Sequence, residues 1–331
     1  MNIAILKSTA QAMVAKGKGI LAADESSKTI QKRFDKIGLQ STPKTNISYR
    51  KILFSTPQIE KYISGVILYD ETIRQSIDGT PVPQYLQGKG VIAGIKVDRG
   101  AFDLPNFPGE KITEGLDGLR SRLEEYKALG AKFAKWRAVI TIDEGIPTDT
   151  CIEANTEALA RYAGLCQEQD IVPIVEPEVL MDGDFDLEKC QEVTAKTLKK
   201  TFEKLAAHKV VLEGVILKPN MIISAKLFAT QATAKEIARA TVETFLEVVP
   251  KAVPGIVFLS GGQTPNQATE NLYEINVISG SPWQLSYSYG RALQDEALTS
   301  WAGKDENIKL AKDAFLSRCK KVSLARQGKL S

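Results

Sequence analysis

The stretch GVILKPNM, residues 214–221, decides the fold, because an apolar strand stops there on a charged residue. The residues before Lys218 are apolar without interruption and predict a strand that is buried on both faces. Pro219 follows Lys218 directly and ends that strand. An ammonium group in this position either reaches out to water or acts as a reagent inside a pocket.

Seven further apolar runs along the chain have a similar form, since each also carries a polar residue at or near its end. Together with 214–219, the runs lie at 19–24, 64–70, 91–98, 133–139, 171–178, 255–262 and 285–290. Helical patterns separate most of them. Eight buried strands that alternate with helices predict a (β/α)8 TIM barrel of class α/β, although a doubly wound sheet has the same periodicity.

The chain shows no internal repeat, no low-complexity segment and no linker. We therefore expect one domain over residues 1–331, a length that α/β barrels commonly fill. Near the start of the chain, Ile5, Ala12 and Met13 predict an amphipathic helix rather than a signal peptide.

Composition excludes several classes of function. The 43 basic and 40 acidic residues nearly balance, which argues against a nucleic-acid partner. The single histidine, His208, argues against a histidine-ligated metal, and we expect neither a metal nor another cofactor. The four cysteines lack disulfide or zinc spacing and predict free thiols in a reducing, cytoplasmic setting. No apolar run approaches the length of a membrane span.

Strand parity groups the polar residues at the ends of these runs. Because side chains alternate between the two faces of a strand, Lys218 shares a face with Ile216. The residues placed in the same way at other strand ends are Asp24, Lys96, Asp98, Lys135, Arg137, Glu176 and Glu178. If these faces point into a barrel, the polar side chains meet at its C-terminal mouth, where barrel enzymes hold their active sites.

Each of these residues alone has an ordinary explanation. Lys218 fits a lysine that extends to water, Asp24 fits the cap of the next helix, and Glu176 and Glu178 fit strand-end charges. Together they predict chemistry, because charges are costly to bury unless they are paired or functional. A lysine attacks a ketone only as the neutral amine, which burial and a neighbouring cation such as Lys135 favour. Nearby carboxylates then carry the protons.

The segment FLSGGQTP predicts an anion site. Ser260, Gly261 and Gly262 follow the seventh strand just before a helix begins, and Arg291 follows the eighth strand. Glycines let the backbone approach an oxyanion, and a helix N-terminus supplies partial positive charge. The loops after strands seven and eight are the usual phosphate site of such barrels, although a Gly-Gly pair alone also fits a plain turn.

The whole set of motifs resembles class I fructose-bisphosphate aldolase. The segments that match, in order along nearly the whole chain, are GILAADES, GVILYDET, GIKVDRG, FAKWRAV, PIVEPE, ILKPNM, FLSGGQ and SYGRAL. The resemblance implies a metal-independent barrel lyase that cleaves fructose 1,6-bisphosphate reversibly, in glycolysis and gluconeogenesis. The products are dihydroxyacetone phosphate and glyceraldehyde 3-phosphate.

The resemblance also implies roles for individual residues. Lys218 falls on the Schiff-base lysine, Glu176 on the general acid/base with Glu178 beside it, and Asp24 on the residue that helps deprotonate the hydroxyl on carbon 4. Lys135 falls on the lysine of the KWR motif. The implied substrate and phosphate contacts are Arg33, Lys96, Arg137, Ser260, Gly261, Gly262, Ser288 and Arg291.

The chain departs from the family pattern in three places. Animal members end in a tyrosine that assists proton exchange, whereas the last tyrosine here is Tyr289, so we expect another group to do that step. Ile47 and Ser48 stand where the family often carries arginine, which predicts the loss of one basic contact. Lys28 stands where glycine is common, which predicts a different loop after Asp24. The family is commonly tetrameric, so we expect a homo-oligomer such as a homotetramer.

Two other functions remain open at this stage. A second Schiff-base phosphosugar lyase, such as a transaldolase-like enzyme, would share the lysine but would not need basic groups for two phosphates. A non-catalytic binding protein on the same fold would have no need of Lys218 or Glu176, and both are present.

Overall fold

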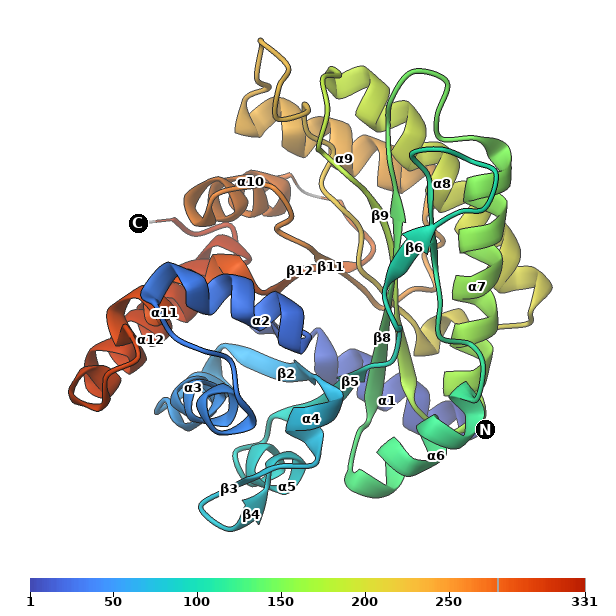
Figure 1. The fold of residues 1–331 in the computed structure, drawn as a ribbon. Helices are drawn as coiled ribbons and strands as arrows, with labels where there is room; N and C mark the ends of the chain where they lie inside the picture. Colours follow the sequence, from blue (N-terminus) through green and yellow to red (C-terminus); the bar gives the residue numbers. More distant parts are fainter. Residues whose placement is uncertain (279, 331) are drawn as a thin grey trace.

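The computed structural model describes residues 1–278 and 280–330 of the chain. Within those residues, eight parallel strands close into a barrel in the order β1-β12-β11-β10-β9-β8-β5-β2 (Figure 1). The strands are β1 (Gly19–Ala23), β2 (Ile63–Leu68), β5 (Ile92–Lys96), β8 (Phe133–Ile140), β9 (Val172–Val179), β10 (Ile216–Leu217), β11 (Gly255–Phe258) and β12 (Gln284–Tyr289). The predicted TIM barrel is confirmed, and the doubly wound sheet is excluded.

Helices surround the barrel on its outer side, except that α1 lies across one end (Figure 1). They are α1 (Ile3–Met13), α2 (Ser27–Phe34), α3 (Pro43–Ser55), α4 (Asp70–Ile73), α5 (Val82–Gly88), α6 (Leu119–Leu129), α7 (Asp149–Glu168), α8 (Leu187–Ala207), α9 (Ala234–Val248), α10 (Pro265–Val277), α11 (Arg291–Trp301) and α12 (Ile308–Ala325). Two hairpins lie in the loops, and they pair β3 (Ser76–Ile77) with β4 (Thr80–Pro81) and β6 (Ala101–Asp103) with β7 (Lys111–Thr113). No helix of the described residues is long and apolar enough to cross a membrane.

The sixth barrel strand is shorter than the sequence indicates. Strand β10 covers only Ile216–Leu217, and Gly214 belongs to the 3₁₀ helix η3 (Leu212–Gly214). Lys218 follows the strand directly, and its backbone N–H still donates to the carbonyl of Val175 at 2.8 Å. The strand parity therefore continues to Lys218, although the regular ladder has ended.

The inside of the barrel is filled by the side chains that parity predicts. Ile20, Phe133, Ile174 and Ile216 are fully buried and belong to one apolar cluster inside the strands. The Phe133 ring occupies the centre, where a Cβ added to Gly94 would come within 2.2 Å of it. The glycine in β5 therefore makes room for a large side chain on β8, as expected of close packing in a barrel core.

Helix α1 closes the end of the barrel at which the strands begin. Leu6, Ala10 and Met13 join the interior cluster, and the hydroxyl of Ser64 donates to the carbonyl of Met13. The predicted helix is present, but its predicted inner face is partly wrong. Ile5 is 44% exposed and Ala12 is exposed as well, because the buried stripe follows the four- and three-residue steps from Leu6 to Met13.

Candidate active site

Lys218 lies at the opposite end of the barrel, where the strands finish. Its side chain is only 6% exposed, and Nζ is 3.1 Å from Oε1 of Glu176 on β9. The residues that follow hold it there, because Pro219 accepts a hydrogen bond from the N–H of Leu259 and Asn220 accepts one from the N–H of Val179. The abrupt end of GVILKPNM thus fixes the amine at the barrel mouth.

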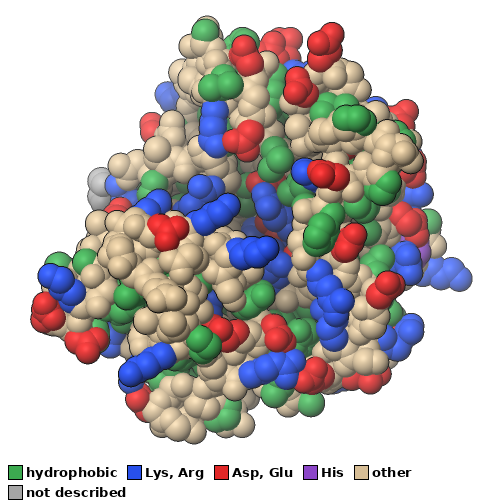
Figure 2. All heavy atoms as spheres, in the orientation of Figure 1, with side chains coloured by type: hydrophobic (Ala, Val, Ile, Leu, Met, Phe, Trp, Pro, Cys, Tyr) green, Lys and Arg blue, Asp and Glu red, His purple; other side chains and the backbone are tan. Residues whose placement is uncertain are grey.

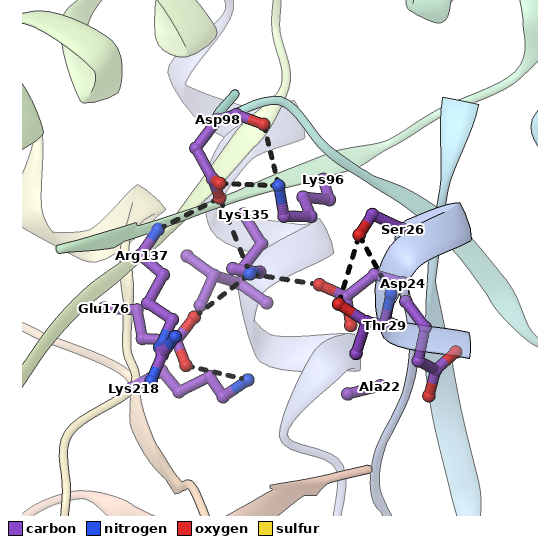
Figure 3. A network of polar contacts seen from close by, with 12 residues as sticks. Ala22, Asp24, Ser26, Thr29, Lys96, Asp98, Lys135, Arg137, Glu176 and Lys218 are labelled. Atoms are coloured by element: carbon purple, nitrogen blue, oxygen red, sulfur yellow. Dashed lines mark hydrogen bonds and ion pairs between the residues drawn. The ribbon is translucent and has the colours of Figure 1, made fainter. Parts of the chain in front are cut away.

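Lys135 on β8 is the centre of the charge cluster shown in Figure 3. Its Nζ lies 3.0 Å from Asp24, 3.4 Å from Glu176 and 3.6 Å from Asp98. Burial alone would lower the pKa of Lys135, but the three carboxylates outweigh it and raise the pKa well above its ordinary value. Lys135 is therefore a fixed cation beside Glu176, the carboxylate that also touches Lys218.

Asp24 is an anion of the same cluster. Burial alone would raise the pKa of its carboxyl, but the charges of Lys135 and Lys218 hold that pKa well below its usual range. Asp24 does not cap α2, which was the ordinary explanation of this residue. The cap is Ser26, whose side-chain oxygen accepts from the N–H of Thr29.

Asp98 is a member of the cluster to which the family resemblance assigned no role. It is buried, and its carboxylate lies 2.5 Å from Nζ of Lys96 as well as near Lys135. Burial opposes the ionised form, but Lys135 and Lys96 together lower the pKa of Asp98. Parity placed Asp98 on the same face as Lys96, so the sequence carried the signal. Which lysine it would touch depends on the neighbouring strand β8.

The predicted residues line one cavity of about 470 Å³ at the barrel mouth, with the exception of Gly262. Figure 2 shows Lys and Arg side chains gathered around the hollow at the centre of this face. Gly262 lines a neighbouring cavity instead, and its backbone packs against Met181. The described residues that also line the active cavity but were not predicted are Glu25, Ser26, Thr29, Lys32, Lys36, Leu259 and Gly290.

One side of the cavity suits an anion. Ser260 and Gly261 follow β11, Ser288 lies in β12, and Arg291 begins α11. The Ser288 hydroxyl is buried and has no hydrogen-bond partner among the described residues, so it is free to bind a ligand. Glycine at position 261 leaves room for the Glu178 carboxylate, because a Cβ there would lie 2.7 Å from Oε1 of Glu178.

A second side of the cavity, at the N-terminus of α2, also suits an anion. Ser26, Thr29 and Lys96 line it, and the helix N-terminus adds partial positive charge. The hydroxyls of Ser26 and Thr29 lie 3.1 Å apart (Figure 3). The sequence signal was the serine pair after Asp24, but hydroxyl residues there also fit an ordinary helix cap.

Arg137 and Glu178 form the rim between β8 and β9. The guanidinium of Arg137 donates to Glu178, and its backbone N–H donates to Asp98 at 3.3 Å. Burial alone would lower the pKa of Arg137, but Glu178 raises it above its ordinary value. Glu178 is thus bound by Arg137, whereas the two carboxylate oxygens of Glu176 face the ammonium groups of Lys218 at 3.1 Å and Lys135 at 3.4 Å. The two glutamates of PIVEPE therefore differ in their partners, and among the described residues Glu176 is the one paired with Lys218.

Other sequence features lie away from this cavity. Tyr289 is fully buried, and its hydroxyl donates to the carbonyl of Ala268. Lys28 is exposed in the first turn of α2, and His208 caps the C-terminus of α8 and lies 2.8 Å from Glu157. Among the described residues, no three His, Cys, Asp or Glu side chains gather in a way that would hold a metal ion.

Comparisons with known proteins point to one family. The sequence profile of the family described as "Fructose-bisphosphate aldolase class-I" matches residues 5–331. The chain is 55% identical over 332 residues to a "Probable fructose-bisphosphate aldolase class 1" of Xanthomonas campestris pv. campestris, covering 99% of both chains. It is 47% identical to the fructose-bisphosphate aldolase of Plasmodium falciparum, covering 98% of this chain and 89% of that protein.

A solved structure has the same fold throughout. It is a ternary complex of the Plasmodium falciparum fructose-bisphosphate aldolase with TRAP and a small-molecule inhibitor, and it superposes with a TM-score of 0.98 at 47% identity. The match covers 99% of this chain and 95% of that chain.

Proposed function

We propose, from the premise that this chain belongs to the family of class I fructose-bisphosphate aldolases, that Lys218 is the amine that forms the Schiff base with the substrate. The activity itself is that of the family, because the match runs through nearly the whole chain. The enzyme is a lyase of glycolysis that acts on a phosphosugar, fructose 1,6-bisphosphate.

The observation that carries the proposal is the contact between Lys218 and Glu176. The two side chains are buried, and Nζ lies 3.1 Å from Oε1, within range for direct proton transfer. Lys218 passes one ammonium proton to Glu176, and the neutral amine then attacks the ketone carbon of the substrate. A second proton moves from the nitrogen to the former ketone oxygen and gives the carbinolamine. Protonated Glu176 donates its proton to the carbinolamine hydroxyl, which leaves as water, and an iminium remains on Lys218.

Carbon–carbon cleavage then uses the charge of that iminium. A carboxylate removes the proton from the hydroxyl on carbon 4, the bond between carbons 3 and 4 breaks, and its electrons pass to the iminium nitrogen. Asp24 is the proposed acceptor, since its carboxylate lines the same cavity as Lys218 and contacts Lys135 at 3.0 Å. Lys135 supports both carboxylates as a fixed cation. The enamine later takes a proton at carbon 3, and water releases dihydroxyacetone phosphate.

The cavity suits a substrate with a phosphate at each end. Ser260, Gly261, Ser288 and Arg291 line one side, and Ser26, Thr29 and Lys96 line the other, with Lys218 also in the wall. This arrangement supports an enzyme that acts on a bisphosphate over the transaldolase-like alternative. A substrate with a single phosphate would leave one of the two sides without an anion. The comparison of fructose 1,6-bisphosphate with fructose 1-phosphate tests this point, and equal kcat/KM for both substrates would contradict it.

Borohydride trapping tests the role of Lys218. The enzyme is incubated with fructose 1,6-bisphosphate and EDTA, reduced with borohydride and digested for peptide mapping. We expect a single reduced adduct on Lys218 and none in a Lys218→Met variant, and no inhibition by EDTA since the lysine route needs no metal. An adduct on Lys135 or Lys96 instead of Lys218 would overturn the assignment.

The assembly and cellular location of the enzyme are further parts of the proposal. We propose a homo-oligomer, a homotetramer by analogy with the family, and sedimentation velocity would measure it directly. A cytoplasmic location is supported by the four cysteines, all of which are buried free thiols. Fractionation of the cells that make the protein checks the location.

A further inference from the structure

Glu25 follows Asp24 directly in the sequence but points to the opposite side of β1. Asp24 faces Lys135 inside the barrel, whereas the Glu25 carboxylate lies among α2, α3 and α11 and is only 4% exposed. Oε1 of Glu25 lies 2.5 Å from the Arg33 guanidinium of α2 and accepts a hydrogen bond of 2.9 Å from Gln294 of α11. A buried carboxylate with two such partners is a structured junction rather than a solvated charge.

Arg50 of α3 completes this junction, which we call the Glu25 junction and which consists of Glu25, Arg33, Arg50 and Gln294. The guanidinium of Arg50 is 1% exposed, donates to the carbonyl of Glu25 at 2.9 Å and lies 3.9 Å from its carboxylate. Its other carboxylate partner is Glu71, at 3.4 Å. The fourth member, Gln294, also donates to the carbonyl of Ala22 in β1 at 2.6 Å.

The Glu25 junction lies next to the side of the cavity that Ser288 and Arg291 line. An Nη atom of Arg33 would be 3.3 Å from a Cβ placed on Gly290, the residue just before Arg291. The N–H of Gln294 donates to the carbonyl of Gly290, so the first turn of α11 is attached to the same point. Glu25 therefore contacts both the arginine that lies over this loop and the helix that begins with Arg291.

We propose that Glu25 is a positioning residue for phosphate binding: it holds the Arg33 guanidinium at the loop between β12 and α11. An arginine with a free side chain must lose rotamer freedom before it can bind phosphate with two N–H groups. The Glu25 contact restricts that freedom before the substrate arrives. The inference rests on the proposed role of Arg33 in phosphate binding. It adds that Glu25 holds Arg33 in the position in which it binds phosphate.

A double-mutant cycle tests the proposal. Glu25→Gln keeps the shape of the side chain but removes its charge, and Arg33→Met removes the guanidinium. We expect Glu25→Gln to raise KM for fructose 1,6-bisphosphate and Ki for inorganic phosphate about tenfold, which corresponds to one charge-assisted contact. We expect kcat to change less than about threefold, because Lys218 and Glu176 are not touched. In the Arg33→Met background, Glu25→Gln should raise KM little further.

Glu71→Gln is the matched control, since it also removes a carboxylate from Arg50 but does not contact Arg33. It should lower the melting temperature without raising KM. If Glu25→Gln does not fold, Glu25→Asp takes its place in the cycle, because it keeps a negative charge beside Arg50 but shortens the reach to Arg33.

The outcomes separate the two proposals. An unchanged KM in Arg33→Met alone would overturn the role of Arg33 in phosphate binding. A normal effect of Arg33→Met, with an equal effect of Glu25→Gln in both backgrounds, would overturn the positioning role of Glu25. An equal rise in KM for Glu71→Gln would show that a general loss of packing around Arg50 explains the result, which also overturns the proposal.

Discussion

At the scale of single residues, the two glutamates of PIVEPE show how neighbours decide a role. Glu176 and Glu178 lie on the same face of β9, and both are buried. Glu178 is bound by Arg137, whereas the two oxygens of Glu176 face Lys218 and Lys135. The carboxylate in direct contact with the proposed Schiff-base lysine is the one suited to exchange protons with it.

A Glu176→Gln substitution tests this difference. The amide cannot accept the proton of Lys218, so we expect kcat for cleavage of fructose 1,6-bisphosphate to fall by about 10²- to 10⁴-fold. Borohydride trapping on Lys218 should slow as well, while KM stays within about threefold of the original value since the phosphate contacts are unchanged. A fall in kcat of less than about tenfold would contradict the proposed role of Glu176.

At the scale of elements, the segment after β10 holds its lysine without regular secondary structure. Strand β10 is two residues long, yet residues 218–225 are all buried. Asn220 supplies the connection that a longer strand would have made, because it accepts from the N–H of Val179 and donates to Thr194 of α8. The side-chain amide of Asn220 thus connects the segment after β10 to β9 and to α8.

We expect Asn220→Leu to reduce both stability and activity. The N–H of Val179 would lose its partner in a buried place, which costs about 1–3 kcal/mol of unfolding free energy. Lys218 lies two residues away, so kcat should also fall severalfold. Urea unfolding and cleavage assays measure the two effects.

Thr233→Ala is the control for this substitution. It removes the cap of α9, which costs about 1 kcal/mol, but leaves the segment that carries Lys218 intact. Its kcat should be unchanged. If Asn220→Leu loses stability but keeps full kcat, the side chain stabilises the fold without placing the lysine.

At the scale of the whole molecule, the two ends of the barrel differ in structure, since one is closed and the other holds the cavity. The closed end is bound together by Arg326 after α12, whose guanidinium donates to the carbonyls of Val14, Ala15 and Lys18. The open end carries a cluster of buried carboxylates and lysines. Burial opposes the charge of Arg326 and lowers its pKa to about 10, so it remains a cation at neutral pH. The hydrogen bonds of Arg326 and the packing of α1 thus close one end of the barrel. The charged side chains of the proposed active site lie at the other end.

The charge cluster predicts how stability depends on pH. Asp24 has a lower pKa in the folded protein than its ordinary 3.8, so its ionised form stabilises the fold above that value and loses this effect as the pH falls. Lys135 has a raised pKa, so its contribution is complete below its ordinary 10.5 and is lost only at higher pH. The contribution of this pair to stability should therefore be independent of pH between about 5 and 9.

An Asp24→Asn variant separates this contribution from the other carboxyls. We expect its melting temperature to be lower than that of the original protein at pH 7, and the gap to narrow as the pH falls below about 4. Melting curves at several pH values measure the gap. A gap of constant size down to pH 3 would mean that Asp24 does not stabilise the fold through its charge.

The sequence by itself determined the eight barrel strands, the inward faces of Ile216 and Ile174, and the position of Lys218 at a strand end, because these depend on local periodicity. It also placed Asp24, Lys135 and Glu176 at one end of the barrel. Only the tertiary structure decided which of them touch, that Asp98 pairs with Lys96 and Lys135, and that Gly262 lies outside the cavity. The inner face of α1 and the junction at Glu25 were decided in the same way. Contacts between residues that are far apart in the chain depend on how strands and helices pack. A local sequence pattern does not say which of these residues will lie close together in space.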